Sequence, residues 1–259
     1  MNGKICTSIP ARDSMSLAEG IARAFNEGSD IVEVRFDYSS KDAINDLLYT
    51  VMEYRDRMIF TCRSRDEGGV FDGSEADRLI VLKRLASFRP MLLDIEYNTI
   101  EKDEELYDHI RVLNCDLLIS YHDFNHTPSI DRLAEIMDGM LEYSNSVKIV
   151  TMAESIEDNE IILALYDMVK GKDIQLVAFC MGKHGLASRV LCTMLGAPFT
   201  YAALDEPLAP SQLTLAQMRR IYKAMHEMGY AESIRNDRDT INMVVGLIGS
   251  VLARIDEMD

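Results

Sequence analysis

The chain of 259 residues is 47% hydrophobic and carries a formal net charge of −16 at pH 7. Its length fits one large α/β barrel or two small domains, and its hydrophobic share is normal for a globular protein. The acidic balance argues against nucleic acid and against anionic membranes as partners, because both attract cationic proteins.

Location is indicated by the N-terminus and by the cysteines. Residues 1–4 lead directly into a strand-like run, and no hydrophobic run is long enough to cross a membrane. The five cysteines form no CxxC pair, which predicts reduced, buried thiols rather than disulfides or metal ligands. We therefore expect a cytoplasmic protein.

Short runs rich in Val, Ile, Leu and Phe recur about every 25 to 30 residues and are typical of buried strands. They cover residues 4–9, 31–36, 58–62, 91–95, 117–121, 147–152, 175–180 and 199–203. The segments between them have helical spacing. Ser129 can cap a helix over 130–141, and Thr214 can cap one over 213–225.

Eight strands that alternate with helices, without a linker, predict a single α/β domain folded as a (β/α)8 TIM barrel. The competing fold is an open doubly wound sheet, which would need a glycine-rich phosphate turn after the first strand. Residues 8–12 contain no glycine, so the barrel is favoured. We divide the chain into a catalytic barrel, residues 1–229, and a C-terminal helical extension, residues 230–259.

The extension is predicted from a hydrophobic stripe at i, i+3, i+4 and i+7 spacing, which indicates an additional helix. The stripe consists of Ile241, Val244, Val245, Ile248, Val251, Leu252 and Ile255. Gly246 and Gly249 lower its helix propensity, so we expect it to pack on the barrel or on a second subunit.

Lys148 and His122 are the most informative residues. Lys148 lies in the sixth strand-like run, and His122 follows the fifth, so the two should lie side by side in a barrel. An ammonium group is costly to bury, and a lysine there can become a neutral amine that forms an imine with a carbonyl. A nearby histidine can transfer the protons. The pair predicts imine chemistry with histidine as acid and base.

Charged or polar side chains end nearly every predicted strand, on faces shared by alternate residues. Any single one could be an ordinary solvated strand end, but a whole ring of them inside a barrel requires mutual pairing or a ligand. The ring comprises Glu33, Arg35, Asp37, Thr61, Arg63, Asp94, Glu96, Ser120, His122 and Lys148.

Two glycine-containing segments add to this ring. Gly68 and Gly69 after Glu67 predict a mobile loop that can approach a ligand closely. The turn over 181–189 enters a helix and could hold a phosphate or carboxylate, with Arg189 as a fork for the anion. His122 and His126 form the one close histidine pair, but the intervening segment is loop-like, which disfavours a metal site.

Together these motifs resemble those of the type I 3-dehydroquinate dehydratases, the imine-forming lyases of the shikimate pathway. The resemblance covers roughly residues 4–226, in the family's order. The matching segments are EVRFD (33–37), TCRSRDEGG (61–69), DIE (94–96), SYHDF (120–124), Lys148, Met181-Gly182 with Gly185, Ser188-Arg189, and Pro210 with Gln212.

The resemblance implies dehydration of 3-dehydroquinate to 3-dehydroshikimate, without a metal or an organic cofactor. Lys148 would form the imine, His122 would move protons, and Glu67 would orient His122. Substrate-binding roles would fall to Arg189 at the carboxylate and to Ser8, Glu33, Arg35, Arg63 and Gln212 at the ring hydroxyls and pocket wall. The small-molecule substrate is the expected partner, and a homodimer is the expected assembly, because dimers are common in the family.

The chain departs from the family pattern in the loop after the eighth strand. Leu208 stands where a serine is common, and Ser211 stands where a glycine is common. One hydroxyl contact to the substrate is therefore expected to be missing. The segment after about residue 229 is not covered by the resemblance.

Two alternatives remain at the level of sequence. Another Schiff-base barrel, such as an aldolase, would explain Lys148 and His122 but not Arg189 or the Glu67 loop. The second alternative is a non-catalytic barrel retained for binding or assembly, in which the C-terminal helix would carry the function. It is disfavoured because none of the expected chemical residues is missing.

Overall fold

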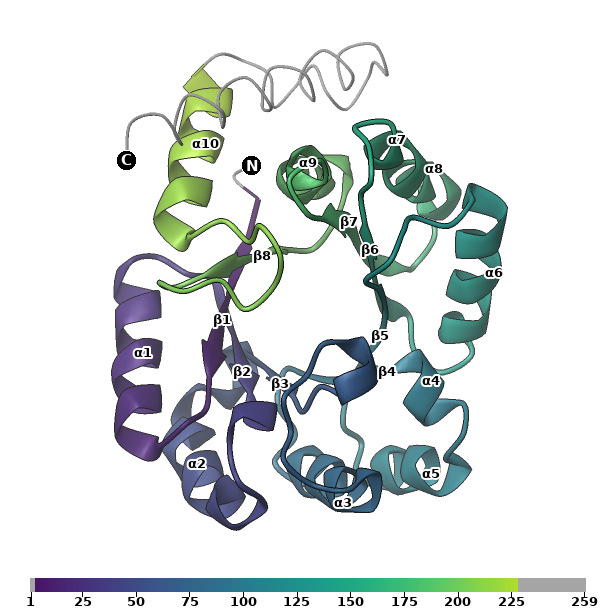
Figure 1. Cartoon of the computed structure of the whole chain (residues 1–259). Helices are drawn as coiled ribbons and strands as arrows, with labels where there is room; N and C mark the ends of the chain where they lie inside the picture. Colours follow the sequence, from purple (N-terminus) through teal and green to yellow (C-terminus); the bar gives the residue numbers. More distant parts are fainter. Residues whose placement is uncertain (1–2, 228–259) are drawn as a thin grey trace.

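The computed structural model describes residues 3–227, which form a nearly closed barrel of parallel strands surrounded by helices (Figure 1). The sheet order is β7-β6-β5-β4-β3-β2-β1-β8. The strands are β1 Ile5–Pro10, β2 Ile31–Arg35, β3 Met58–Thr61, β4 Leu92–Glu96, β5 Leu117–Asp123, β6 Ser146–Met152, β7 Gln175–Met181 and β8 Thr200–Ala203. The predicted TIM barrel is confirmed, and all eight predicted strands form within one or two residues of their expected bounds.

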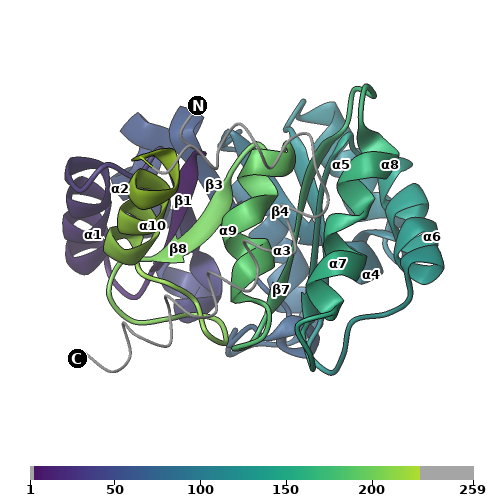
Figure 2. The same ribbon diagram turned by 90° about the horizontal axis from the view of Figure 1, so that it is seen from above.

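Helices on the outside of the strands separate the barrel from solvent, as the view in Figure 2 shows. They are α1 Ser14–Asn26, α2 Ile44–Val51, α3 Glu75–Ala86, α4 Tyr97–Ile100, α5 Glu104–Val112, α6 Ile130–Leu141, α7 Asp158–Leu163, α8 Leu165–Val169, α9 Leu186–Leu195 and α10 Leu215–Glu227. Both predicted caps are present. Ser129 accepts from the amide of Arg132, and Thr214 accepts from the amide of Gln217.

The barrel has a seam between β7 and β8, which are the two ends of the hydrogen-bonded strand order. Aromatic side chains pack across this seam. The ring centroids of Phe179 on β7 and Tyr201 on β8 lie 6.3 Å apart across the seam. On the β8 side, Phe199 packs against Tyr201 with a centroid distance of 5.5 Å. Side-chain packing therefore joins the two strands where backbone hydrogen bonding does not.

The register of β5 and β6 sets the relative depth of the two chemical residues. Lys148 pairs with Ser120, and His122 pairs with Val150. Because alternate residues share a face, Lys148 and His122 lie on the same face, with His122 one layer nearer the carboxyl end of the strands. Lys148 is the third residue of β6 and not a strand-end residue.

Three further expectations concern parts of the chain away from the site. All five cysteines are buried and free, as the absence of a CxxC pair predicted. Among residues 3–227, no helix is both long and hydrophobic enough to span a membrane. The predicted C-terminal helix and the domain limit at residue 230 lie outside the described residues.

Candidate active site

Lys148 is the centre of the site, and the structure gives its charge a partner. The residue is 4% exposed, and its Nζ lies 2.5 Å from Oδ2 of Asp94 on β4. Nζ also lies 4.8 Å from the ring centroid of Tyr201. From the sequence, we expect a buried lysine to avoid the cost of desolvation by becoming a neutral amine. The structure instead places the amine of Lys148 in an ion pair with Asp94.

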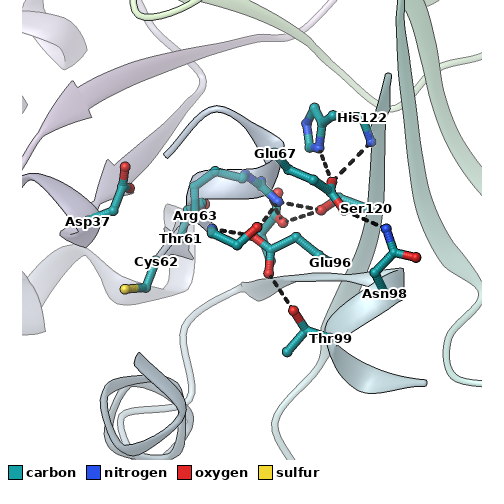
Figure 3. Close-up of polar contacts among 12 residues, drawn as sticks. Asp37, Thr61, Cys62, Arg63, Glu67, Glu96, Asn98, Thr99, Ser120 and His122 are labelled. Atoms are coloured by element: carbon teal, nitrogen blue, oxygen red, sulfur yellow. Dashed lines mark hydrogen bonds and ion pairs between the residues drawn. The ribbon is translucent and has the colours of Figure 1, made fainter. Parts of the chain in front are cut away.

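Arg63 links this ion pair to Glu96 on β4 and to Ser120 on β5. Its guanidinium pairs with Asp94 at 2.7 Å. It also pairs with Glu96 at 3.0 Å and donates to Ser120 at 2.6 Å (Figure 3). Although burial alone would raise the pKa of Asp94, the Arg63 and Lys148 cations lower it to about 2. Asp94 is therefore an ionised acceptor that holds both cations in place.

Glu67 and His122 form the second feature of the site. Oε2 of Glu67 lies 2.8 Å from Nδ1 of His122 and accepts from the backbone amide of His122 at 3.0 Å. Oε1 accepts from Asn98 at 3.3 Å, and Figure 3 shows the carboxylate between His122 and Asn98. Glu67 thus fixes the imidazole orientation and leaves Nε2 as the ring nitrogen available to a ligand.

The environment makes this pair responsive near neutral pH. Burial raises the pKa of Glu67 to about 8, and the Glu96 carboxylate adds to the effect. Burial lowers the pKa of His122 well below its usual value, and the cations of Arg63, Lys148 and Arg35 add to that effect. Because a hydrogen bond joins the two groups, they titrate as a unit.

The protonation of the pair decides whether Nε2 is a base. With Glu67 ionised, the carboxylate accepts from Nδ1–H and Nε2 keeps a free lone pair. When the pair takes up one proton, a protonated Glu67 donates to Nδ1, or the imidazole becomes a cation. In both cases Nε2 of His122 carries hydrogen and can only donate.

Glu33 and Arg35 line the wall formed by β2. Oε1 of Glu33 accepts from Thr61 at 2.9 Å. The guanidinium of Arg35 makes two hydrogen bonds of 2.8 Å to the two carboxylate oxygens of Asp37. Asp37 therefore orients Arg35 and compensates part of its charge.

Arg189 is buried, and no carboxylate among residues 3–227 pairs with it. It is 2% exposed, and its Nε and Nη2 atoms have no hydrogen-bond partner among the described residues. The guanidinium lies over the ring of Phe179, 4.3 Å from the centroid, and burial lowers the pKa of Arg189 to about 10. It stays a cation at neutral pH, and its free N–H groups suit an anionic ligand.

The loop between β8 and α10 closes the pocket. Oε1 of Gln212 accepts from the amide of Leu208 at 2.9 Å, so this side chain braces the loop. Ser211 has φ of +53°, in the left-handed region that favours glycine. This backbone conformation explains why glycine is common at this position in the family. The carbonyl of Pro210 accepts from the amide of Gly182 and joins the loop to the end of β7.

All nine site residues expected from the sequence line one pocket at the carboxyl end of the strands. The lining consists of Ser8, Glu33, Arg35, Arg63, Glu67, Gly68, His122, Phe124, Lys148, Val150, Phe179, Met181, Arg189, Tyr201, Leu208, Ala209 and Gln212. A larger hollow of about 920 Å³ lies on the outer surface, around α7, α8 and the end of α9. Its lining is mainly aliphatic and includes none of the nine residues, so we assign the site to the barrel pocket.

The glycine-containing segments have packing roles in the structure. Gly68 has φ of +79° and packs against Phe124, while Gly69 packs against the carbonyl of Arg63, where a Cβ atom would collide. These glycines allow close packing of the Glu67 loop, and Gly68 lines the pocket as expected, whereas the mobility of the loop stays a prediction. At the start of α9, the amide of Ser188 donates to Asn159, so Arg189 is the part of that turn offered to an anion.

Sequence reasoning missed several supporting residues. Asp94 belonged to the polar ring but was not assigned a role. The inward-facing cations of that ring, Arg35, Arg63 and Lys148, nevertheless require inward-facing anions. Arg78 on α3 is 2% exposed and pairs with Glu96 at 2.8 Å, and nothing in its local pattern predicts burial. Tyr201 belongs to a hydrophobic run, which by itself predicts only a strand residue.

His126 lies outside the pocket chemistry. Its side chain is 55% exposed and its Nδ1 lies 3.5 Å from Asp123. Within residues 3–227, no group of three or more His, Cys, Asp or Glu side chains has an arrangement suited to a metal ion.

A (β/α)8 barrel with a buried lysine, a carboxylate-oriented histidine and a free arginine in one pocket has the organisation of a TIM-barrel enzyme. The type I 3-dehydroquinase family model matches residues 5–229, and the chain belongs to this family. It is thus a member of a lyase family, as the resemblance implied.

Similar proteins agree with this membership. A 3-dehydroquinate dehydratase of Dehalococcoides mccartyi is 35% identical over 225 residues, covering 86% of this chain and 94% of the relative. One of Pyrococcus abyssi is 37% identical over 213 residues, covering 82% and 95%. The crystal structure of 3-dehydroquinate dehydratase from Geobacillus kaustophilus has a TM-score of 0.77 at 23% identity, covering 87% and 91%, and supports the fold.

Proposed function

We propose that this chain dehydrates 3-dehydroquinate to 3-dehydroshikimate through an imine on Lys148. The observation that carries the proposal is the placement of Lys148, His122 and Arg189 in one pocket, with a distinct chemical environment for each. Family membership supports the reaction, and the geometry supports the roles that we propose for the residues.

Lys148 forms the imine with the ring ketone. The ammonium group and the ketone give a protonated imine and one water, so positive charge is conserved at the nitrogen. Asp94 stays ionised and keeps a counter-charge beside that nitrogen throughout. A protonated imine withdraws electrons strongly and acidifies the hydrogen on the adjacent carbon.

His122 transfers the protons of the elimination. Its Nε2 accepts the proton from the carbon beside the imine, and the electron pair moves into an enamine. The enamine then expels the hydroxyl group on the next carbon, which leaves as water after protonation by the His122 cation. Glu67 holds the imidazole through Nδ1 and stabilises its cationic form between the two steps.

Arg189 binds the substrate carboxylate. Its Nε and Nη2 groups have no partner among the described residues, and a carboxylate accepts from two such groups side by side. Glu33, Arg35, Arg63, Ser8 and Gln212 are assigned to the ring hydroxyls and the pocket wall. Arg189 thereby offers a local cation to an anionic substrate, although the chain as a whole carries a net charge of −16.

The test of the function is conversion of 3-dehydroquinate by the purified chain, followed by ultraviolet absorbance of the conjugated product. We expect turnover in the wild type, none in Lys148→Ala, and unchanged turnover in the surface control Lys172→Ala. Conversion by Lys148→Ala at the wild-type rate would reject the role of Lys148. Absence of conversion by the wild type would reject the function itself.

We further propose a homodimer working in the cytoplasm, with residues 1–229 as the catalytic barrel and 230–259 as an added segment. The proposal follows from the expectations drawn from sequence. Size-exclusion chromatography with light scattering, on the full chain and on a chain ending at residue 229, tests both the assembly and the domain limit. A monomeric full chain contradicts the dimer, and a shortened chain that does not fold contradicts the limit.

A further inference from the structure

Three buried side-chain atoms among the described residues have no hydrogen-bond partner, and all three belong to residues of the pocket. They are Nε and Nη2 of Arg189 and the hydroxyl of Tyr201. The proposed carboxylate contact explains the two arginine atoms. It does not explain the tyrosine hydroxyl, which takes no part in binding the carboxylate or in the proton transfers of His122.

Tyr201 lies directly beside the reactive amine. It belongs to β8, pairs in register with Cys6, and packs its ring against Phe179 across the seam. Nζ of Lys148 lies 4.8 Å from its ring centroid. Tyr201 and Lys148 also line the same pocket, so a substrate carbon bound to Nζ lies in the pocket that Tyr201 lines.

The hydroxyl keeps its proton at neutral pH and can therefore donate a hydrogen bond. Burial raises the pKa of Tyr201 well above its usual value, and the nearby Glu33 carboxylate adds to the effect. The neighbouring carboxylate of Asp94 is already an acceptor for Lys148, Arg63 and Ser120. The phenol is therefore a protonated donor whose partner is not provided by the described part of the chain.

We propose that the Tyr201 hydroxyl is a further catalytic residue, which donates a hydrogen bond to the substrate oxygen on the carbon attacked by Lys148. The inference rests on the proposed function, because it assumes an imine at Lys148. A buried donor without a partner among residues 3–227, on a ring that packs against the attacking nitrogen, matches the substrate oxygen that must come close to that nitrogen.

The step in question is formation of the carbinolamine and its loss of water. The N–C bond forms as the carbonyl π pair moves onto oxygen, and the proton released by nitrogen passes to that oxygen. The Tyr201 O–H group stabilises the negative charge that develops there, without giving up its own proton. A second proton passes from the Lys148 ammonium to Nε2 of His122 before attack and from there to the departing water, so ammonium and ketone yield protonated imine and water.

Tyr201→Phe removes the hydroxyl and keeps the ring. Rapid-quench mixing with 3-dehydroquinate, followed by borohydride and mass spectrometry of the Lys148 peptide, measures the rate of imine formation. We expect this rate to fall about 10- to 100-fold in Tyr201→Phe, because a donor to a developing oxyanion is lost. The melting temperature should stay the same or rise, because the variant removes a buried hydroxyl without a partner.

Tyr166→Phe is the matched control. Tyr166 is equally buried, but its hydroxyl donates to the carbonyl of Ala178 at 3.0 Å and accepts from its amide at 2.7 Å. We expect its removal to lower the melting temperature and to leave the rate of imine formation unchanged. The two tyrosines should therefore show opposite effects on stability and on rate.

The outcomes separate this inference from the function on which it rests. Wild-type protein that forms no adduct contradicts the proposed function. Adduct formation at the same rate in the wild type and in Tyr201→Phe contradicts the inference alone. A slower rate together with a lower melting temperature, as in a structural hydroxyl, also contradicts it.

Discussion

Nζ of Lys148 and Oδ2 of Asp94 lie 2.5 Å apart at the centre of the barrel, and both side chains are almost completely buried. Asp94 also pairs with Arg63. One carboxylate therefore compensates two buried cations, and removing it would leave both without their nearest counter-charge.

Asp94→Asn is accordingly expected to lower the free energy of unfolding by about 3–5 kcal/mol, the range found when one member of a buried ion pair is removed. Urea unfolding measures the change. The control is Glu105→Gln, because Glu105 is 86% exposed and pairs with Lys83 at the surface. That change should alter stability by less than about 1 kcal/mol. Equal effects in the two variants would contradict the central role of Asp94.

His122→Ala should separate imine formation from turnover. The amine of Lys148 remains in place, so borohydride should still trap an adduct in the variant. Turnover should fall about 10²- to 10⁴-fold, which is the usual loss when a general acid–base residue is removed. Steady-state kinetics and adduct mass are the two readouts. Near-normal turnover would show that another group moves the protons.

The pH dependence of kcat/KM should report the Glu67–His122 pair. Nε2 of His122 is a base only when the pair has lost its shared proton, and the pKa of Glu67 is raised to about 8. The base-dependent rate should therefore rise with pH and level off above about 8.

Glu67→Gln tests the origin of that pH dependence. The carboxamide of this variant cannot take up the proton, and the pKa of His122 is low, so the rising limb should move to lower pH while the maximum rate falls. If kcat/KM of Glu67→Gln still rises with pH up to about 8, as expected for the wild type, another group is responsible for the titration.

Arg189→Met should weaken substrate binding without weakening the fold. Loss of charge-assisted hydrogen bonds to the carboxylate is expected to reduce kcat/KM by about 30- to 150-fold, equivalent to about 2–3 kcal/mol. Stability should not fall, because the variant removes a buried guanidinium with two atoms lacking partners among the described residues.

A carboxamide analogue of the substrate sharpens this test. The wild type should discriminate strongly against the neutral analogue, and Arg189→Met should lose most of that preference. The control Arg132→Met changes an exposed arginine that pairs with Glu135 and should behave as the wild type. Undiminished discrimination in Arg189→Met would place the carboxylate elsewhere.

The strands and the fold were predictable because each barrel strand is a short hydrophobic run between helices of clear periodicity. The same periodicity put Lys148 and His122 on one face of adjacent strands. Depth along the strand was not predictable. Register between strands depends on packing of the whole sheet, and Lys148 proved to lie one layer below His122.

The sequence predicted which residues belong to the site better than it predicted which of them contact each other. Alternation identifies which residues face inward, but it does not say that Asp94 rather than Glu33 approaches Lys148. Partners from outside the strands leave little local signal. Arg78 on α3 and Asn98 on α4 reach Glu96 and Glu67 through tertiary packing alone.

The hydroxyl of Tyr201 illustrates the same limit. A tyrosine in a hydrophobic run is usually a packing residue. Only the three-dimensional structure shows that this hydroxyl is buried, that it lacks a partner among residues 3–227 and that its ring lies against the Lys148 amine. The close packing of Gly68 and Gly69 against Phe124 and the Arg63 carbonyl also depends on tertiary contacts that the sequence does not reveal.

The central claim is that Lys148 forms the covalent intermediate. Its most direct test is reduction with borohydride in the presence of 3-dehydroquinate, followed by mass spectrometry of peptides from the inactivated protein. We expect one reduced adduct, located on Lys148 and absent from Lys148→Ala. Formation of product by the wild-type chain with no adduct on Lys148 would contradict the claim.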